Sequence, residues 1–301
     1  MKCFFHSADL DGHCSGAIVK YAYPQCEMIG INYGQEFPWT QIERGEKVFM
    51  VDFCLEPFED MLKLKEQCDL VWIDHHKTAI EESKKYFIEN WAGIREIGKA
   101  ACELTWLYLF HSVESSFPAR PIPLTVHFLG RHDVWDHSDS RTLPFQYRMR
   151  LDDMNPENDE AMERWKFLFE NPAPEVMERM IREGHLLQRY EEQQDAKFCR
   201  AYAFETELTG YSEEGGRAGR YRAICCNRGF TNSRVFNSVY DPQKHDLMIA
   251  FSRLPLPSRK WKVSLYATKE NVDCGAIAKF FEGGGHKGAA GFQCSELPFD
   301  Y

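Results

Sequence analysis

The sequence predicts an α/β fold: a mostly parallel-sheet N-terminal domain joined by a helical linker to a smaller C-terminal α/β domain. In the N-terminal half, short apolar runs alternate with segments of helical periodicity, which is typical of a parallel sheet with crossover helices. A long, highly charged segment follows Pro172 and Pro174, and its few core positions predict an exposed connecting helix. We therefore expect domains over residues 1–172 and 203–301, with a linker over 173–202.

The composition indicates a folded globular protein. Of the 301 residues, 44% are hydrophobic and 14% aromatic, which is enough for a sizeable core. No apolar run is long enough for a membrane-spanning helix, and the N-terminal segment lacks the apolar region of a signal peptide. We therefore expect a cytoplasmic protein without a membrane partner. The 11 cysteines form no C-x-x-C pair, which favours buried, reduced thiols over disulfides or a zinc ribbon.

Charge is distributed unevenly along the chain. The formal net charge is -10, from 36 Lys and Arg against 46 Asp and Glu. Residues 217–301 hold 13 basic and 7 acidic residues, a balance of +6, which leaves 23 against 39, or -16, for residues 1–216. The acidic part would repel a long polyanion unless metal ions intervene, whereas the basic part can attract phosphate. We expect no long duplex nucleic acid as a partner.

Two aspartates lie at the first strand-to-helix turn. Residues 2–6 are predicted to form a strand and residues 13–23 a helix, with Asp9, Asp11 and Gly12 between them. Residues two apart in a turning segment can face the same side, and Gly12 permits a tight turn or a close backbone approach. An ordinary turn explains this pattern as well, but a calcium loop does not, because its later ligands are missing.

Two further predicted strands also end in acids. The strands expected here cover residues 27–31, 47–51 and 70–73, with a helix over about 57–67. Asp52 follows the second of these strands, and Asp74, His75 and His76 follow the third. Ligands of parallel sheets bind at the carboxyl ends of the strands, and carboxylates with imidazoles are usual ligands of divalent metals. A surface turn with two solvated histidines is the alternative.

The two adjacent histidines are expected to have different roles. On an extended chain, consecutive side chains point to opposite sides. Only one of His75 and His76 should therefore reach a given metal ion. The other is then available to contact substrate or to support a ligand.

The middle of the chain is predicted to be helical and to carry more candidate ligands. Helices are expected over residues 99–110, 121–129, 157–170 and 175–200, and residues 138–160 are irregular in places. The second of these helices leads into Arg131, His132, Asp133, Asp136 and His137. Such a cluster can hold metal, but a solvated, capped helix end is the alternative. Apolar residues over 104–110 are expected to be exposed, which would permit a homodimer.

The C-terminal part alternates short apolar runs with turns and then reaches a glycine-rich loop. Strands are expected over residues 202–208, 220–226, 247–251 and 261–266, a hairpin or loop over 211–219, and a helix over 274–281. Gly283, Gly284 and Gly285 are consecutive and cannot form a stable helix or strand interior. With His286 and Lys287 after them, they predict a cradle of backbone N–H groups for an anion such as phosphate. A flexible linker is the alternative.

Together, these motifs resemble those of the DHH family of metal-dependent phosphoesterases, in particular its small two-domain oligonucleotide phosphodiesterases (nanoRNases). The resemblance covers most of the chain and keeps the family's motif order. The motifs are Asp9-x-Asp11-Gly12, Asp52, Asp74-His75-His76, Asp133 within residues 131–135, and Gly283-Gly284-Gly285-His286 with Ala289-Ala290-Gly291. The resemblance implies a metal-binding catalytic domain, a substrate-binding C-terminal domain and a metal site in the cleft between them.

The resemblance also implies two divalent ions, Mn²⁺ by preference, with Mg²⁺ or Co²⁺ admitted by the same ligand types. The ligands implied are His6, Asp9 and Asp52 for one ion, and Asp11, Asp52, His75 and Asp133 for the other. The spacing of His6 from Asp9 departs from the one usual in the family. His132 and Asp136 are neighbouring alternatives to Asp133.

His76 would face the substrate phosphate, with Asp74 as its support, and the loop over residues 283–287 would bind substrate. The function implied is hydrolysis of short oligonucleotides or dinucleotides to mononucleotides by a hydroxide that two metal ions activate. A phosphomonoesterase for nucleoside bisphosphates or for inorganic polyphosphate or pyrophosphate is the enzymatic alternative. A nucleotide-binding sensor with a vestigial site is the alternative from another class of protein.

Overall fold

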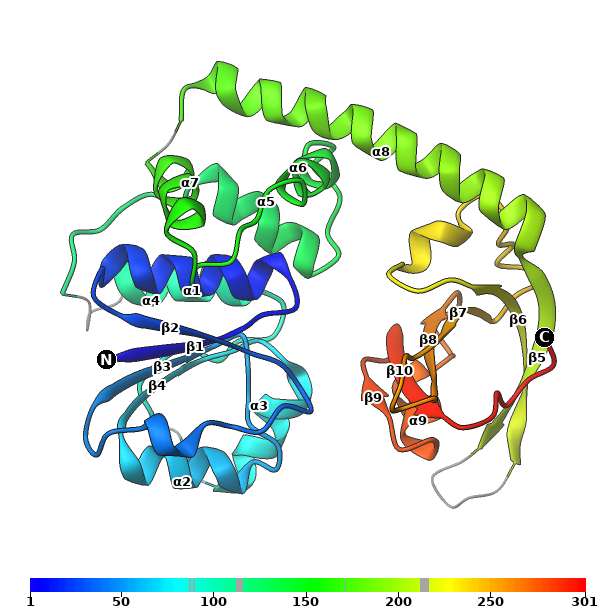
Figure 1. The fold of residues 1–301 in the computed structure, drawn as a ribbon, viewed down its shortest axis with the longest axis horizontal. Helices are drawn as coiled ribbons and strands as arrows, with labels where there is room; N and C mark the ends of the chain where they lie inside the picture. The colour runs from blue at the N-terminus through cyan, green and yellow to red at the C-terminus, as the bar shows by residue number, and fades with distance from the viewer. Residues whose placement is uncertain (87, 89, 112–115, 171, 212–216) are drawn as a thin grey trace. The chain divides into compact units, whose positions relative to one another are not determined.

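Figure 1 shows a computed structural model of the chain, which describes residues 1–86, 88, 90–111, 116–170, 172–211 and 217–301. The chain divides into two compact units, Met1–Gln188 and Arg189–Tyr301. Each unit has its own sheet and its own hydrophobic core. The charged segment predicted to be helical is a single helix, α8 (Pro174–Tyr202), and it includes the residues at which the two units divide.

Four parallel strands form the sheet of the first unit, in the order β2-β1-β3-β4. They are β1 (Lys2–His6), β2 (Glu27–Ile31), β3 (Lys47–Val51) and β4 (Asp69–Ile73), as the apolar runs predict. Phe5 is paired with Val51, and Val51 with Ile73, so these strands end at the same edge of the sheet. The parallel-sheet prediction is confirmed, and the residues that follow each strand are brought together.

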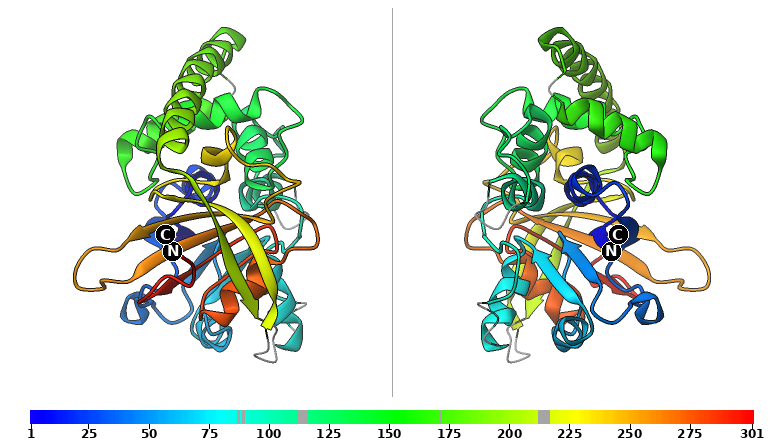
Figure 2. Two further views of the ribbon diagram at one scale, coloured as in Figure 1. Left: turned by 90° about the vertical axis from the view of Figure 1, so that its right-hand side faces the viewer. Right: turned by 90° about the vertical axis from the view of Figure 1, so that its left-hand side faces the viewer.

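Helices cover both faces of this sheet (Figures 1 and 2). On one side are α1 (Leu10–Ala22), α4 (Ala101–Phe110), α5 (Leu124–Asp133), α6 (Thr142–Met149) and α7 (Asp159–Phe169); on the other are α2 (Glu59–Gln67) and α3 (Lys77–Ser83). Short 3-10 helices lie at η1 (Trp39–Gln41) and η2 (Lys84–Tyr86). The first unit has two hydrophobic clusters, and successive side chains of β1 pack into different ones. Phe4 packs in the cluster that contains Trp72, and Phe5 packs in the cluster that contains Trp106.

The helical layer differs from the prediction in two places. Leu104, Trp106 and Phe110 are buried because α4 packs between α1 and α5, so the predicted apolar exposure over residues 104–110 is wrong for these side chains. The stretch expected to be irregular contains α6, whose Phe145 and Met149 are buried. The helix has only 8 residues and includes Pro144, so it is too short to show a clear helical period in the sequence.

Gly184 allows α8 to approach α6 closely within the first unit. A Cβ atom on Gly184 would lie 1.8 Å from the carbonyl oxygen of Pro144. Arg148 of α6 links the same helices, since its Nε lies 2.7 Å from Glu183 Oε2. Glycine costs roughly 1 kcal/mol more than alanine in a helix interior. The close packing gives a physical reason for a glycine at this position.

A six-stranded mixed sheet, in the order β5-β6-β7-β8-β10-β9, forms the second unit. The strands are β5 (Phe204–Tyr211), β6 (Arg217–Asn227), β7 (Leu247–Arg253), β8 (Trp261–Ala267), β9 (Gly284–Gly285) and β10 (Ala289–Cys294). The pair β6–β7 is parallel, and the other pairs are antiparallel. The unit also contains α9 (Cys274–Phe280) and η3 (Ser233–Phe236). Residues 212–216, at the tip of the predicted hairpin, lie outside the described residues.

The glycine-rich segment departs from its prediction, because two of its residues do form a strand. Gly284 and Gly285 pair with residues of β10 as the short edge strand β9. A Cβ atom on Gly283 would lie 2.2 Å from the carbonyl oxygen of Gly291, and one on Gly285 would lie 2.5 Å from the Cα of Ala290. The close approach of two backbones therefore accounts for these two glycines. Gly284 has no atom within 4 Å of such a Cβ position, and its outer side is open.

All 11 cysteines are free, and all except Cys294 are buried, which confirms the expectation of reduced thiols. Within the ranges that the structure describes, no helix is long and apolar enough to span a bilayer.

We expect Gly184→Ala to destabilise the protein by about 1–3 kcal/mol, because the added methyl group forces α8 away from α6. Denaturant unfolding measures the change, with Gln193→Ala on the exposed side of α8 as the control. If Gly184→Ala instead stabilised the fold by the roughly 1 kcal/mol that helix propensity alone supplies, the close packing of α6 and α8 would be refuted.

Candidate metal centre

The carboxyl edge of the first sheet gathers acids and imidazoles from five segments of the chain. The cluster contains three groups of three residues, and within each group the ligand atoms lie within 4.8 Å of one another. The groups are His6 with Asp9 and Asp52, Asp11 with His75 and Asp133, and Asp52 with His75 and His76. All six residues predicted as metal ligands are therefore brought together, and Asp52 and His75 each belong to two groups.

Asp52 lies at the centre of this cluster. Its side chain is 2% exposed, and one or other of its oxygens lies 3.6 Å from His6 Nδ1 and 3.3 Å from His75 Nε2. The Oδ1 atom is buried without a hydrogen-bond partner among the described residues. The backbone of Asp52 is left-handed, with φ of 55°. Both features cost free energy, of order 1–3 kcal/mol for the backbone alone, and such costs concentrate at functional sites.

The first turn of α1 places the two neighbouring aspartates. Asp9 is the N-cap residue, and its Oδ1 accepts a hydrogen bond from the Gly12 N–H at 3.0 Å. Its Oδ2 lies 3.3 Å from His6 Nδ1. A Cβ atom on Gly12 would lie 2.0 Å from the carbonyl oxygen of His6, so only glycine lets α1 begin against the end of β1. This close contact between the end of β1 and the start of α1 brings the side chains of His6 and Asp9 together.

Asp11 is held by the N-terminus of another helix. The backbone N–H groups of Ala101 and Cys102, at the start of α4, donate to its two carboxylate oxygens at 2.8 and 2.9 Å. These N–H groups have no partner within their own helix, and the helix dipole favours a negative charge there. The backbone of α4 therefore fixes the orientation of the Asp11 carboxylate, a contact that the sequence did not indicate.

Asp74 shapes the turn that carries both histidines. It is fully buried, and its Oδ1 accepts hydrogen bonds from the backbone N–H groups of His75 at 2.7 Å and His76 at 3.1 Å. The chain turns here before α3 begins at Lys77, so the expectation that the two imidazoles point to opposite sides is wrong. Their ring centroids lie 4.6 Å apart, and both reach Asp52.

The last turn of α5 supplies Asp133, whose Oδ2 lies 3.3 Å from His75 Nε2. The two neighbouring candidates have other partners. Asp136 forms an ion pair with Arg131, and His132 Nδ1 lies 3.0 Å from His137 Nε2. Both interpretations of this segment therefore apply, since it is a capped helix end that also contributes a carboxylate to the cluster.

The electrostatics of the cluster suit bound cations. Burial, with the nearby charge of Asp52, raises the pKa of Asp11 to about 7, and burial with the charges of Asp11 and Asp52 raises that of Asp133 well above its usual value. Burial alone would lower the pKa of His75, but Asp52 and the charges of Asp11 and Asp133 raise it to about 10. The crowded carboxylates of Asp11 and Asp133 are thus harder to ionise than free carboxylates. Divalent cations would relieve the same repulsion.

A small hollow adjoins the carboxylates within the first unit. Its volume is about 190 Å³, and Asp9, Asp11 and Asp133 are among the residues that line it. Trp135, Gln146 and Arg150 line the same hollow. Sequence reasoning did not select Gln146 or Arg150, because the segment that contains them was not predicted to be helical.

In the second unit, a hollow of about 440 Å³ adjoins the glycine-rich segment. Lys260 and Lys262 line it together with Gly283 and Gly284. Its cationic side chains and open glycine backbone are the groups that an anion site requires. His286 and Lys287 are exposed but are not among the residues that line this hollow.

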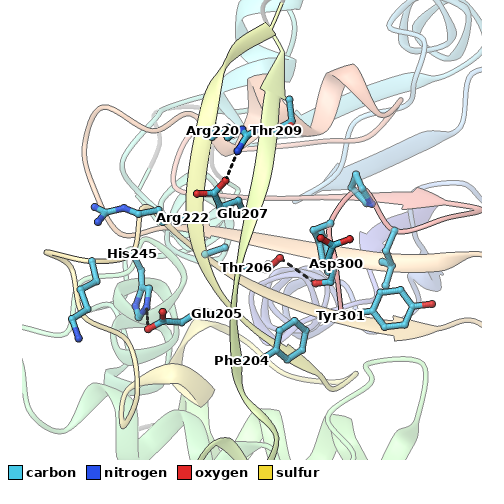
Figure 3. Close-up of a pocket in the computed structure, with 15 residues that line it drawn as sticks. Phe204, Glu205, Thr206, Glu207, Thr209, Arg220, Arg222, His245, Asp300 and Tyr301 are labelled. Atoms are coloured by element: carbon cyan, nitrogen blue, oxygen red, sulfur yellow. Dashed lines mark hydrogen bonds and ion pairs between the residues drawn. The ribbon is translucent and has the colours of Figure 1, made fainter.

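Figure 3 shows a wider hollow of about 1040 Å³ in the second unit, beside strands β5 and β6. Two of its acids have basic partners: His245 Nε2 lies 3.3 Å from Glu205 Oε1, and Arg220 Nη1 lies 3.0 Å from Glu207 Oε2. Among the described residues, the groups whose ligand atoms lie close enough together to hold a metal ion include none that line this hollow.

No protein-family model and no curated protein sequence matches this chain. Among solved structures it is similar to an uncharacterized protein from Helicobacter pylori G27, with 16% identity and a TM-score of 0.40 over 99% of this chain and 94% of the other. It is also similar to an exopolyphosphatase-related protein from Bacteroides fragilis, with 14% identity and a TM-score of 0.47 over 98% and 87%.

A third similar structure is the pGpG-specific phosphodiesterase PggH from Vibrio cholerae, with 12% identity and a TM-score of 0.51. The similarity covers 97% of this chain and 92% of the other. At this low identity the match concerns the fold and not the reaction. The chain therefore shares the fold of a phosphodiesterase.

Proposed function

We propose that this chain is a divalent-metal-dependent phosphodiesterase that hydrolyses short oligonucleotides or dinucleotides to mononucleotides. The observation that carries the proposal is the cluster of four carboxylates and three imidazoles at the carboxyl edge of the first sheet. The similarity in fold to a pGpG-specific phosphodiesterase is a precedent for this chemistry on the same architecture.

Two ions are assigned to the cluster. His6, Asp9 and Asp52 would hold one, and Asp11, Asp52, His75 and Asp133 the other, with Asp52 shared. The ions would lower the pKa of water and offset the charge of the phosphate during in-line attack. Asp and His ligands suit Mn²⁺, and they admit Mg²⁺ or Co²⁺ as well.

His76 and Asp74 act on the substrate side of the site in this proposal. Asp74 Oδ1 lies 2.7 Å from His76 Nδ1, and an ionised carboxylate there requires Nδ1 to carry a proton. Burial lowers the pKa of His76, but the contact with Asp74 outweighs it and raises the pKa. Asp74 therefore orients the imidazole and favours its protonated form, from which His76 would donate a hydrogen bond to a phosphate oxygen.

The glycine-rich loop of the second unit is assigned to substrate phosphate. The open backbone at Gly284 and the nearby amino groups of Lys260 and Lys262 support this assignment. Gly283, Gly285, His286 and Lys287 belong to the same loop, whose hairpin is closed by a hydrogen bond from the His286 N–H to the carbonyl oxygen of Ala289.

Asp52→Asn should abolish both tight Mn²⁺ binding and hydrolysis of a dinucleotide, because it removes the charge shared by the two proposed ions. Isothermal titration calorimetry and product release from a dinucleotide measure the two effects. Asp69→Asn is the matched control, since Asp69 is an exposed aspartate at the opposite end of β4. Parent-like turnover by metal-loaded Asp52→Asn would refute the proposed function.

Asp74→Asn should lower kcat on a dinucleotide by about 10–100-fold, the usual effect of losing a group that orients a site imidazole. Mn²⁺ affinity should change less than in Asp52→Asn, because Asp74 supports His76 and is not assigned to either ion. An equal loss of metal binding in the two variants would contradict the division of roles.

Dinucleotides should be hydrolysed faster than nucleoside bisphosphates or inorganic polyphosphate when the three are assayed side by side with the Mn²⁺-loaded protein. The physical reason is that a phosphodiester between nucleosides offers groups on both sides of the reacting phosphorus for binding. Faster release of phosphate from a nucleoside bisphosphate would identify a phosphomonoesterase instead, and faster release from polyphosphate would identify a hydrolase of phosphoanhydride bonds.

A further inference from the structure

Trp135 occupies a backbone position that normally belongs to glycine. The Trp135 N–H donates to the carbonyl oxygen of His132 at 3.0 Å, and the Asp136 N–H donates to that of Arg131 at 2.7 Å. This pair of hydrogen bonds is the Schellman motif that ends a helix, with Trp135 as the residue after the C-cap. Its φ of 59° is left-handed, a conformation that glycine adopts freely and that strains a bulky side chain.

Packing does not explain this choice of residue. Trp135 is 54% exposed, so about half of this large apolar residue remains in contact with water. The ring of His137 lies edge-on to the indole at 4.9 Å, and that of His132 lies at 5.9 Å, so imidazoles flank the indole and limit its movement. A half-exposed tryptophan with a strained backbone and imidazoles beside it is better explained by a role in binding a ligand than by a contribution to the stability of the fold.

The indole borders the small hollow next to the proposed metal ligands. Asp9, Asp11 and Asp133 also line that hollow, whose volume is about 190 Å³. This is below the roughly 300–1,000 Å³ of sites that enclose drug-sized ligands. A single ring system can enter, but a whole dinucleotide cannot.

Gln146 also lines the hollow. Its side chain is largely buried, and its Oε1 has no hydrogen-bond partner among the described residues. A buried amide oxygen without a partner costs free energy, which a donor on a ligand would recover. Arg150 also lines the hollow, and it lies one helical turn beyond Gln146, so both side chains belong to one face of this segment.

We propose that the hollow is a nucleobase subsite, which makes the substrate a nucleotide ester rather than a chain of phosphates. The inference rests on the proposed function, because it places the base beside the phosphate that the metal ligands would hold. Trp135 stacks on the face of the base, Gln146 accepts a hydrogen bond from its edge, and Arg150 donates to a base oxygen or to the sugar. An aromatic face tolerates any base, whereas Gln146 favours bases that present a donor.

The test compares binding of AMP with binding of ribose 5-phosphate, which carries the same phosphate without a base. Calorimetry on the Mn²⁺-loaded full chain should show tighter binding of AMP to the parent. Trp135→Gly should weaken AMP binding by about 5- to 150-fold, the range that stacking on an aromatic side chain supplies. It should leave ribose 5-phosphate binding unchanged, and Trp135→Phe should retain most of the AMP affinity.

The stability of the Trp135→Gly variant distinguishes a role in base binding from a structural role. Glycine is the preferred residue at this position of the helix cap, so the midpoint of denaturant unfolding for Trp135→Gly should equal or exceed that of the parent. Phe167→Ala, which removes another half-exposed aromatic ring of the first unit, is the control and should not change AMP binding.

The subsite is refuted if the parent binds AMP and ribose 5-phosphate equally, or if Trp135→Gly weakens both to the same extent. Either result can occur in a protein that hydrolyses dinucleotides, so it would leave the phosphodiesterase proposal intact. Failure of the parent to hydrolyse any dinucleotide, with base-dependent AMP binding still present, would refute the proposed function and retain the base subsite.

Discussion

The main physical constraint on the first unit is the mutual repulsion of four carboxylates, those of Asp9, Asp11, Asp52 and Asp133. Asp52 and Asp11 are almost completely buried, and the raised pKa values of Asp11 and Asp133 express how unfavourable their shared charge is. Histidines between the acids offset part of the charge, and the N-terminus of α4 offsets more. The divalent cations of the proposed site would offset this cost, because they would attract the carboxylates that repel one another.

The fold creates this crowding through simple geometry. Parallel strands that end in register deliver Asp52 and Asp74 to one edge, and β1 delivers His6 beside them. The helices on one face add the remaining acids, because α1 begins and α5 ends at the same edge. A site assembled from strand ends and helix ends requires little flexible chain, so its geometry is set by the packed core behind it.

The sequence predicted the parallel strands and the acids that follow them, because buried strands leave continuous apolar runs that stop where a polar site begins. The prediction from the sequence was wrong where the chain turns. The opposite orientation assumed for His75 and His76 needed an extended backbone, but Asp74 folds the chain back through hydrogen bonds that no spacing rule contains. Helix α6 was missed because its 8 residues are too few to show a periodic pattern, and Gln146 was missed with it. The left-handed backbone of Trp135 is likewise visible only in three dimensions.

In the proposed metal centre, the hydrogen bonds from the start of α4 to Asp11 would affect selectivity among ions. Each oxygen of this carboxylate already accepts one backbone N–H group, so only its remaining lone pairs can reach a cation, and only from directions that the helix allows. The carboxylate cannot rotate to follow an ion of a different radius without breaking those bonds. Such a rigid, preorganised donor loses little entropy on binding and discriminates by size. A large, irregularly coordinated cation such as Ca²⁺ would gain less from it than a compact one.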